Sequence, residues 1–178
     1  MSENHELILE AKHVTKRYPA SGDRMLTACQ DVSLKFYKRK TLGIVGESGC
    51  GKTTTVCAIL QALKNRGHVV ASFKCGPDYI DPMFHSEIIG AQSTNIDLFF
   101  SDEAQARSIF AKHAAELNII EGVMGFYDGM SMDSEKASSH HVARTLDAPA
   151  ILLVNGRGMA LSVAAVVKGY LELRKPSG

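Results

Sequence analysis

The sequence predicts an α/β fold, a mostly parallel sheet with helices on both faces, preceded by a short antiparallel β segment. From residue 41 onward, short apolar runs alternate with segments of helical periodicity, as expected for parallel strands joined by crossover helices. Residues 46–53 read Gly-Glu-Ser-Gly-Cys-Gly-Lys-Thr, which fits the phosphate-cradling pattern G-x-x-x-x-G-K-[ST]. Residues 32–36 alternate apolar and polar side chains, which favours a half-exposed strand ahead of the main sheet.

The first 40 residues are expected to form a β segment of their own. Residues 7–11 are a short strand candidate, and residues 17–24, with a proline and a glycine, predict a loop. Two paired strands are only marginally stable in water. We therefore expect residues 1–40 to be mobile unless they dock on the main sheet, and we expect residues 41–178 to form the main domain.

The glycine-rich loop has the neighbours that its chemistry requires. Residues 41–45 are a short apolar run typical of a buried strand, and residues 54–63 repeat apolar side chains at helical spacing. In such a strand–loop–helix unit, backbone N–H groups and the helix N-terminus attract phosphate oxygens. The lysine would reach the β- and γ-phosphates, and the following hydroxyl would ligate Mg²⁺. The residues expected to bind the nucleotide are Gly46, Ser48, Gly49, Cys50, Gly51, Lys52, Thr53 and Thr54.

The rest of the chain continues the alternation. Two prolines and a glycine within residues 75–82 argue against regular structure there. Ser101-Asp102-Glu103 supplies a helix cap and first-turn acids. Residues 122–134 are rich in glycine and methionine and predict a loop. The remaining predicted strands are 68–74, 117–120 and 150–154, and the remaining predicted helices are 101–115, 139–146 and 160–173.

Unusual residues follow every strand of this predicted sheet. The strand ends deliver the glycine-rich loop, the segment 74–81, Glu121-Gly122 and Asn155-Gly156. In parallel α/β sheets, ligands bind outside the carboxyl ends of the strands. The sequence therefore predicts one site at one edge of the sheet.

Composition limits the function further. With 178 residues and 45% hydrophobic residues, the chain suits one domain of ordinary size. A net charge of +1 favours neither nucleic acid nor an anionic membrane as the main partner. No apolar stretch is long enough to cross a bilayer, and the polar start has no signal-peptide pattern. The four cysteines lack C-x-x-C spacing, so we expect neither a disulfide nor a zinc framework and a cytoplasmic location.

Residues from about 53 to 173 resemble the N-terminal synthetase domain of the cobyrinate a,c-diamide synthase family. The resemblance implies a dethiobiotin-synthetase-like P-loop NTPase domain. It also implies an ATP-dependent amidoligase that activates tetrapyrrole side-chain carboxylates for amidation by ammonia from glutamine. A sister activity of the family uses a nickel-bound tetrapyrrole. The segments that carry the resemblance are 73–82, His85, 95–97, 120–129, 151–155 and 158–160.

Residues 7 to about 53 resemble a different family, the ATPase subunit of ABC importers of the oligopeptide or nickel type. The matching segments are 9–11, 15–18, 31–34 and 41–52. The resemblance implies that Tyr18 stacks on adenine; the alternative is a surface tyrosine in a loop. The ABC pattern stops there, because no Leu-Ser-Gly-Gly-Gln signature and no four apolar residues followed by Asp-Glu come after it. The chain therefore has the form of a chimera.

Four charged residues beyond the loop are candidates for chemistry. Glu121 is expected to hold Mg²⁺ or orient phosphates, although a lone acid after a strand can also cap a turn. Family resemblance makes Asp78 and Asp81 ligands of a metal or of the acyl-phosphate region, with Asx-turn capping as the alternative. Lys74 would stabilise the transferring phosphoryl group, or else be a surface lysine. We expect Lys52, Lys74, Asp78, Asp81 and Glu121 to be catalytic, and Thr53, Asp81 and Glu121 to bind the metal.

Three functional readings stay open at this stage. The first is an ATP- and Mg²⁺-binding amidoligase domain that is incomplete, because the family continues into a glutaminase domain that is expected to be missing here. The second is an ABC importer subunit, and the third is a non-catalytic nucleotide-binding module. The sequence leaves open a homodimer, the choice of tetrapyrrole, and whether the join is natural, engineered or artefactual.

Overall fold

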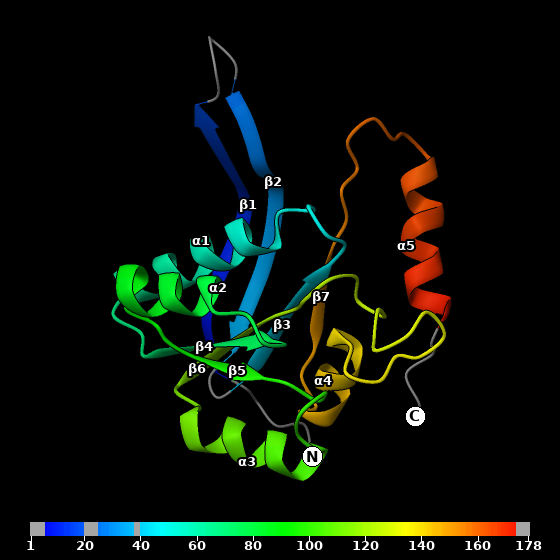
Figure 1. Ribbon diagram of the computed structural model, residues 1–178. Coiled ribbons are helices and arrows are strands. Elements are labelled where there is room, and N and C mark those ends of the chain that lie inside the picture. Colours follow the sequence, from blue (N-terminus) through cyan, green and yellow to red (C-terminus); the bar gives the residue numbers. More distant parts are fainter. Residues whose placement is uncertain (1–5, 20–24, 38–39, 174–178) are drawn as a thin grey trace.

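The computed structural model describes residues 6–19, 25–37 and 40–173 of the chain, without some side chains of the first two strands. Figure 1 shows the arrangement of the elements. The strands are β1 (Leu7–Pro19), β2 (Met25–Tyr37), β3 (Thr41–Gly46), β4 (Val70–Cys75), β5 (Gln92–Ile96), β6 (Leu117–Glu121) and β7 (Ala150–Leu153). The helices are α1 (Lys52–Asn65), α2 (Ile80–Met83), the π-helix η1 (Phe84–Ile89), α3 (Glu103–His113), α4 (Ser139–Thr145) and α5 (Ser162–Leu173).

Five strands form one parallel sheet in the order β5-β4-β6-β3-β7. The predicted α/β architecture is therefore confirmed. Apart from β4 and β5, which pair directly, sequential strands of this sheet are not neighbours: β3 lies between β6 and β7, and β4 lies between β5 and β6. The carboxyl ends of β3, β4 and β6 consequently lie side by side, and the glycine-rich loop, Lys74 and Glu121 meet at the same edge.

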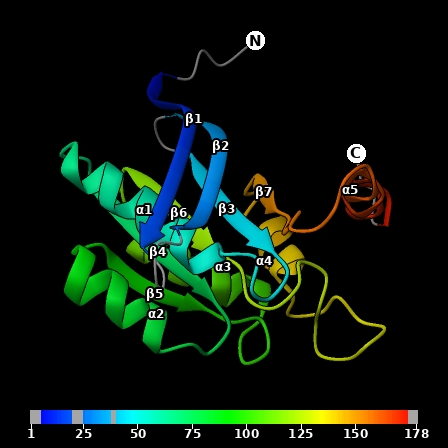
Figure 2. The ribbon, with the colours of Figure 1, turned by 90° about the horizontal axis from the view of Figure 1, so that it is seen from above.

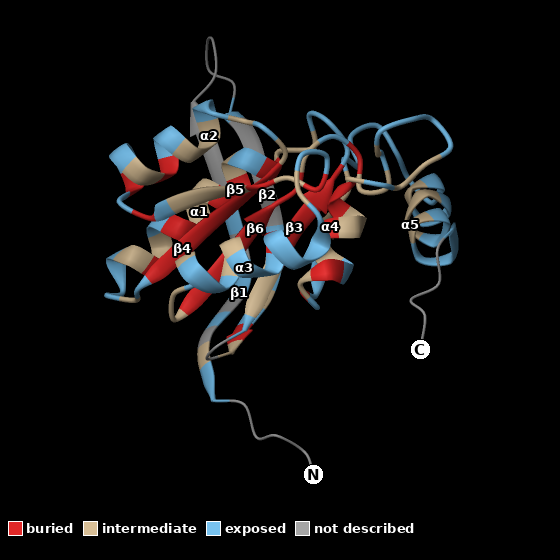
Figure 3. Ribbon diagram, turned by 60° about the horizontal axis from the view of Figure 1, so that its bottom comes forward, coloured by how far each residue is buried: buried red, intermediate tan, exposed pale blue. Residues whose placement is uncertain are grey.

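Each face of the sheet has its own apolar core, because side chains alternate along a strand. Ile119 packs with Val56, Leu60 and Leu63 of α1, whereas the next residue, Ile120, packs with side chains on the α3 and α4 face. Helices α1 and η1 thus cover one face, and α3 and α4 cover the other. Figure 3 shows the buried residues concentrated along the sheet between these two layers.

Local signals set the helix ends, and the predicted cap at the start of α3 is confirmed. Helix α1 ends at a C-cap on Arg66, and Gly67 follows with φ of 82°. Helix α3 begins at Asp102, whose carboxylate accepts a hydrogen bond from the N–H of Gln105, and the Gln105 side chain completes a capping box. On its inner side, α3 packs Phe110 against Phe73 of β4, with ring centroids 4.8 Å apart.

The prediction of an irregular segment over residues 75–82 is wrong in its second half. Asp81 and Pro82 lie in α2, which continues directly into η1. A proline is tolerated there because the N–H groups of a first helical turn have no intrahelical acceptor. Strand β5 was not predicted either. Its sequence, Gln-Ser-Thr-Asn-Ile, has a single fully buried side chain, so this edge strand lacks the apolar run that marks the central strands.

The N-terminal segment is an antiparallel hairpin of two 13-residue strands, separate from the main sheet. The predicted loop over residues 17–24 is too long, because β1 runs to Pro19; residues 20–24 lie outside the described part. Phe36 of β2 is 5% exposed and joins the core on the α1 face, with Ile8 and Leu34 packed against it. The hairpin is therefore docked through its base, next to α1 and β3 in Figure 2.

Helix α5 lies beyond β7, on the opposite side from the hairpin (Figures 1 and 2). It has no buried residue, and the Tyr127 hydroxyl donates to the Tyr170 carbonyl at 2.7 Å. Within the described residues, no helix is both long and apolar enough to cross a membrane.

Candidate functional site

The glycine-rich loop turns tightly between the end of β3 and the start of α1. Gly46 has φ of 151°, and a Cβ atom there would collide with the carbonyl oxygen of Leu153 and lie 2.8 Å from the Cys50 sulfur. Gly51 is the N-cap of α1, with φ of 90°. Only glycine adopts these conformations without strain. The loop backbone can therefore approach a ligand closely at the N-terminus of a 14-residue helix.

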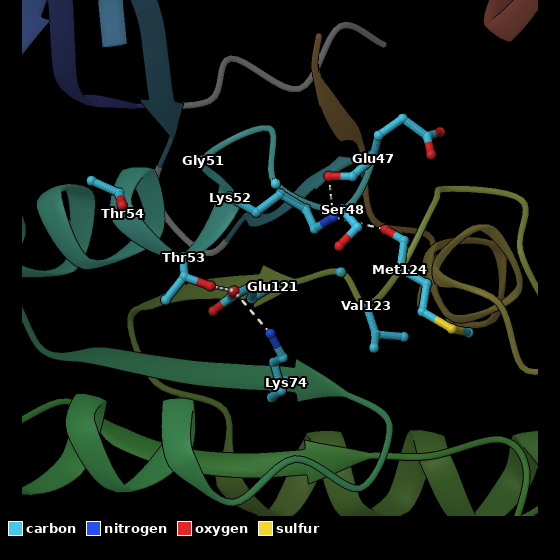
Figure 4. Close-up of a pocket in the computed structure, with 12 residues that line it drawn as sticks. Glu47, Ser48, Gly51, Lys52, Thr53, Thr54, Lys74, Glu121, Val123 and Met124 are labelled. Carbon is cyan, nitrogen blue, oxygen red and sulfur yellow. Dashed lines mark hydrogen bonds and ion pairs between the residues drawn. The ribbon is translucent and has the colours of Figure 1, made fainter. Parts of the chain in front are cut away.

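A pocket of about 330 Å³ opens over this loop. Its walls come from the loop and α1, from the end of β4, and from the residues that follow β6 (Figure 4). Cationic and anionic side chains share it with backbone N–H groups. The lining residues are Glu47, Ser48, Gly49, Gly51, Lys52, Thr53, Thr54, Lys74, Glu121, Gly122, Val123 and Met124.

Lys52 is held at the floor of the pocket by backbone carbonyls. Its ammonium group donates to the carbonyl oxygens of Gly46, of Glu47 at 2.9 Å and of Met124 at 2.7 Å. Met124 lies 72 residues further along the chain and has a positive φ of 48°. An ammonium group has three donors, so all three are used within the protein. An incoming phosphate would have to replace at least one of these carbonyls.

Glu121 is the centre of a second cluster. Its Oε1 atom accepts from the Thr53 hydroxyl at 2.6 Å and from the Lys74 ammonium at 2.9 Å. Lys74 also donates to Asp81 Oδ2 at 2.6 Å and lies 3.6 Å from Asp78 Oδ2. Glu121 is fully buried and Lys74 is 4% exposed. One ammonium thus faces three carboxylates, which leaves this part of the site with a surplus of negative charge.

The pKa values in this cluster follow from burial and charge. Burial raises the pKa of Glu121, although Lys74 and the Thr53 hydroxyl oppose the shift. Burial alone would lower the pKa of Lys74, but the Glu121 and Asp81 carboxylates outweigh it and raise that pKa. At Asp81, burial alone would raise the pKa, but Lys74 outweighs burial and lowers it. Among these three groups, burial decides the direction of the pKa shift only at Glu121, whose side chain is fully buried.

A fully buried histidine, His85 of η1, stands behind Glu121. Its Nδ1 atom is 2.9 Å from the Ser72 hydroxyl, and its Nε2 atom is 3.7 Å from Glu121 Oε2. Burial lowers the pKa of His85, so the ring is expected to be neutral. Among the described residues, neither Nε2 nor Oε2 has a hydrogen-bond partner.

The backbone after Glu121 is fixed by Ser139 of α4. The Ser139 hydroxyl accepts from the Val123 N–H at 2.9 Å and donates to the Val123 carbonyl at 3.0 Å. Gly122 allows this approach, because a Cβ atom there would lie 2.8 Å from the Ser139 oxygen. The turn directs the chain from β6 over the glycine-rich loop, where Met124 reaches Lys52.

The structure brings most of the predicted site residues together. Lys52, Thr53, Lys74 and Glu121 share one pocket, and Asp78 and Asp81 adjoin it through Lys74. The side chain of Tyr18 lies outside the described part, so its stacking on adenine stays a prediction. Gly46 and Cys50 shape the loop without lining the pocket. The other loop residues, Ser48, Gly49, Gly51 and Thr54, line it.

Three contributors were not predicted from the sequence. The carbonyl oxygen of Met124 has no sequence signature, since every residue carries one. Ser139 resembles any helix-start serine. Ser72 could have been suspected, because a polar residue two positions before Lys74 in a buried strand faces the same side of the sheet. Among the described residues, no group of three or more His, Cys, Asp or Glu side chains is arranged to hold a metal by itself.

Comparison with solved structures reveals the same fold in distant proteins. The signal recognition particle receptor FtsY from Elizabethkingia anophelis superimposes with a TM-score of 0.57 at 18% identity, covering 78% of this chain and 48% of that one. Chloroplast FtsY from Physcomitrella patens gives a TM-score of 0.51 at 14% identity, covering 76% and 47%. At these identities the likeness concerns the fold alone.

Curated relatives match at much higher identity. The cobyrinate a,c-diamide synthase of Listeria innocua is 44% identical over 134 residues, which is 74% of this chain and 30% of that protein. The synthase of Synechococcus is 45% identical over 130 residues, 71% and 28% of the two chains. That of Fusobacterium nucleatum is 47% identical over 126 residues, again 71% and 28%. The chain thus spans less than a third of the length of these relatives.

A family model described as ABC transporter matches residues 29–151. This range includes β3, the glycine-rich loop and α1, and it extends to the start of β7. Both resemblances expected from the sequence are therefore confirmed, although the ABC match does not stop near residue 53 as expected. The chain belongs to the ABC transporter family over the matched residues 29–151, and over 71–74% of its length it is a relative of the cobyrinate a,c-diamide synthases.

Proposed function

We propose that this chain is the ATP- and Mg²⁺-binding part of a cobyrinate a,c-diamide synthase-like amidoligase. The observation that carries the proposal is the meeting of Lys52 and Thr53 of the P-loop with Lys74 and Glu121 at one pocket. The curated relatives are cobyrinate a,c-diamide synthases, which supports the same activity. Since the chain spans about 30% of those relatives, the complete glutamine-dependent reaction belongs to the longer proteins.

The donor set fits magnesium. Thr53 Oγ1 lies 2.6 Å from Glu121 Oε1 and 3.4 Å from Asp81 Oδ2, so three oxygen atoms converge where carboxylates outnumber the ammonium. Mg²⁺ is usually held by one or two carboxylates, waters and substrate phosphates rather than by an all-protein cage. Thr53, Asp81 and Glu121 would hold it here. Magnesium, when bound, neutralises charge on the phosphate oxygens.

The proposed reaction has two steps. A carboxylate oxygen of the substrate attacks the γ-phosphorus of ATP, the bond to the β–γ bridging oxygen breaks, and ADP leaves. Ammonia then attacks the carbonyl carbon of the acyl phosphate, inorganic phosphate leaves, and the nitrogen loses a proton. Lys52 would bind the β- and γ-phosphates, and Lys74 would offset charge on the transferring group. A tetrapyrrole would supply the carboxylate.

Wild type and Lys52→Ala should differ in ATP affinity. Removing a charged donor from a phosphate typically costs about 1.5–3 kcal/mol, so the dissociation constant should rise by roughly 10- to 100-fold. Titration calorimetry with MgATP measures this. Arg66→Ala, on the exposed end of α1, is the control and should bind like wild type. Equal affinity of wild type and Lys52→Ala would refute nucleotide binding at this pocket.

The chemical step needs its own assay. Turnover of ATP to ADP should depend on cobyrinic acid and free ammonia if this chain carries the activating step. ATP turnover that ignores the tetrapyrrole would favour a nucleotide-binding module without synthetase activity. Efficient amidation with glutamine by this chain alone would contradict the assignment of the glutaminase to another part of the relatives.

An ABC importer subunit is the second candidate, supported by the family match over residues 29–151. ABC subunits close as dimers on ATP through a Leu-Ser-Gly-Gly-Gln signature, and this sequence contains no such segment. The synthetase assignment is therefore preferred. ATP-dependent dimerisation, measured by light scattering, would favour the ABC alternative.

A further inference from the structure

Two buried polar atoms face each other behind the proposed magnesium site without a partner. His85 Nε2 and Glu121 Oε2 are 3.7 Å apart, and both side chains are fully buried. Leaving a buried polar atom unpaired costs about 1–3 kcal/mol. An approach of less than about 1 Å would bring the pair to the usual N–H···O distance and satisfy both atoms.

The hydrogen bond on the other side of the ring decides which nitrogen carries the proton. The Ser72 hydroxyl lies 2.9 Å from His85 Nδ1 and can donate to it. The proton of a neutral ring then sits on Nε2, directed at an oxygen that only accepts. Ser72 and Lys74 are two residues apart in β4 and so lie on the same face of the sheet. This strand therefore supports Glu121 twice, directly through Lys74 and through the imidazole.

The two oxygens of Glu121 face opposite sides, and only one of them accepts hydrogen bonds. Oε1 accepts from Thr53 and Lys74, which line the pocket, and Oε2 is left for His85 on the core side. A carboxylate held at only one oxygen can rotate about its terminal torsion, which is broad. A donor at the second oxygen would keep Oε1 directed at the pocket.

The helix that carries His85, η1, directs this side chain toward Glu121. Residues Phe84–Ile89 form a π-helix, a rare winding that occurs frequently at functional sites. His85 is fully buried there, whereas its neighbour Phe84 and Ile88 one turn later are 45% and 68% exposed. Phe84 and Ile88 thus face outward, while His85 and Ile89 face inward, and the imidazole faces the carboxylate.

We propose that His85 is a positioning residue that holds the Glu121 carboxylate in the orientation needed for the metal–nucleotide complex. The inference rests on the proposed function, because it concerns the carboxylate assigned there to magnesium. His85 does not contact the pocket and would act only through Glu121. Its effect should therefore appear in the contribution of Mg²⁺ to nucleotide binding, and binding without the metal should be unchanged.

Two amide variants test the geometry of the ring. His85→Gln places an amide N–H near the position of Nε2, whereas His85→Asn places one near Nδ1 only. The measured quantity is the affinity for a fluorescent, non-hydrolysable ATP analogue with Mg²⁺, divided by the affinity with EDTA. Removing a group that hydrogen-bonds to a metal-ligating side chain typically weakens metal affinity by about 10- to 100-fold. We expect His85→Asn to lower the ratio by such a factor and His85→Gln to keep it close to wild type.

Controls separate positioning from simple packing. His113→Asn, on α3, is the matched exchange away from the site and should leave the ratio unchanged. Equal ratios for wild type, His85→Gln and His85→Asn would overturn the inference, whatever happens to thermal stability. If either His85 variant does not fold, Ser72→Ala decides: a reduced ratio supports the inference, and an unchanged ratio overturns it. A wild type that binds no analogue in either buffer would instead refute the proposed function.

Discussion

Lys74 is the residue of the site that is surrounded by the most opposite charge. Its ammonium lies within 3.6 Å of three carboxylates and is almost completely buried. A buried ion pair is costly to break, because the remaining partner is left as an uncompensated charge in a medium that solvates it poorly. Lys74 therefore supports the fold of the site in the absence of ligand, beyond any part in phosphoryl transfer.

Lys74→Met should destabilise the protein by about 3–5 kcal/mol at neutral pH, because it removes the cation and leaves the carboxylates. In the wild type, the raised pKa of Lys74 adds stability that is present below its ordinary value of 10.5 and is lost as the pH rises through the folded value. The lowered pKa of Asp81 adds stability above its ordinary value of 3.8, which is lost on acidification.

Without Lys74, the effect of burial on Glu121 loses its largest opposing contribution, and the pKa of Glu121 rises further above its ordinary value of 4.5. A raised carboxyl pKa gives stability that is lost as the pH rises. The free energy of unfolding of Lys74→Met should therefore fall more steeply than that of wild type as the pH rises above 4.5, the ordinary value for this carboxyl group. Urea denaturation across this range measures it, and adding Glu121→Gln should restore part of the loss. Parallel pH profiles for wild type and Lys74→Met would contradict the assignment.

At the scale of elements, the β1–β2 hairpin is joined to the main domain by few side chains. Among the described side chains of the hairpin, Phe36 alone is fully buried, and it packs in the core under α1. A two-stranded hairpin is marginal by itself. Its order should therefore depend on this one anchor, and we propose the domain boundary near residue 40 on the same ground.

Phe36→Ala should lower the free energy of unfolding by about 3–5 kcal/mol, as for other buried phenylalanines. It should also increase hydrogen exchange in β1 and β2, because the hairpin loses its anchor. Met25→Ala is the control: Met25 lies on the same strand but is 56% exposed, so its loss should have little effect. Equal stability of the two variants would show that the hairpin does not depend on Phe36.

The molecule as a whole is organised around one edge of its sheet. The pocket takes residues from β4, from α1 and its loop, and from the chain after β6. A ligand that binds there contacts segments far apart in the sequence, from Glu47 to Met124. Binding should therefore stabilise the domain against global unfolding and not only order the loop.

At MgATP concentrations about 100 times the dissociation constant, the native state should gain about 2.7 kcal/mol. For a protein of this size, that corresponds to a rise of about 5–10 °C in the melting temperature. Differential scanning calorimetry with and without MgATP measures it. Lys52→Ala should show little of this rise at the same concentration, and an equal rise in both proteins would place the nucleotide elsewhere.

Local sequence patterns were enough to predict the parts of the fold that have local causes. An apolar run followed by spaced glycines specifies the β3–loop–α1 unit, and a capping carboxylate at Asp102 specifies the start of α3. The central strands were recognised by their apolar runs. Lys52 and Thr53 were recognised by the glycine-rich motif, and Lys74 and Glu121 by their positions at the ends of strands. The edge strand β5 and the helical turn at Pro82 were missed, because neither has a distinctive local pattern.

Which side chains meet follows instead from the arrangement of the strands in the folded sheet. The order β5-β4-β6-β3-β7 places β6 beside both β3 and β4, and this is why Glu121 reaches Thr53 and Lys74. It also brings the Met124 carbonyl to Lys52 and His85 to Glu121. Periodicity and turn residues encode local backbone preference and the buried face. Contacts between distant segments depend instead on which strands become neighbours, and that is settled by packing of the whole sheet.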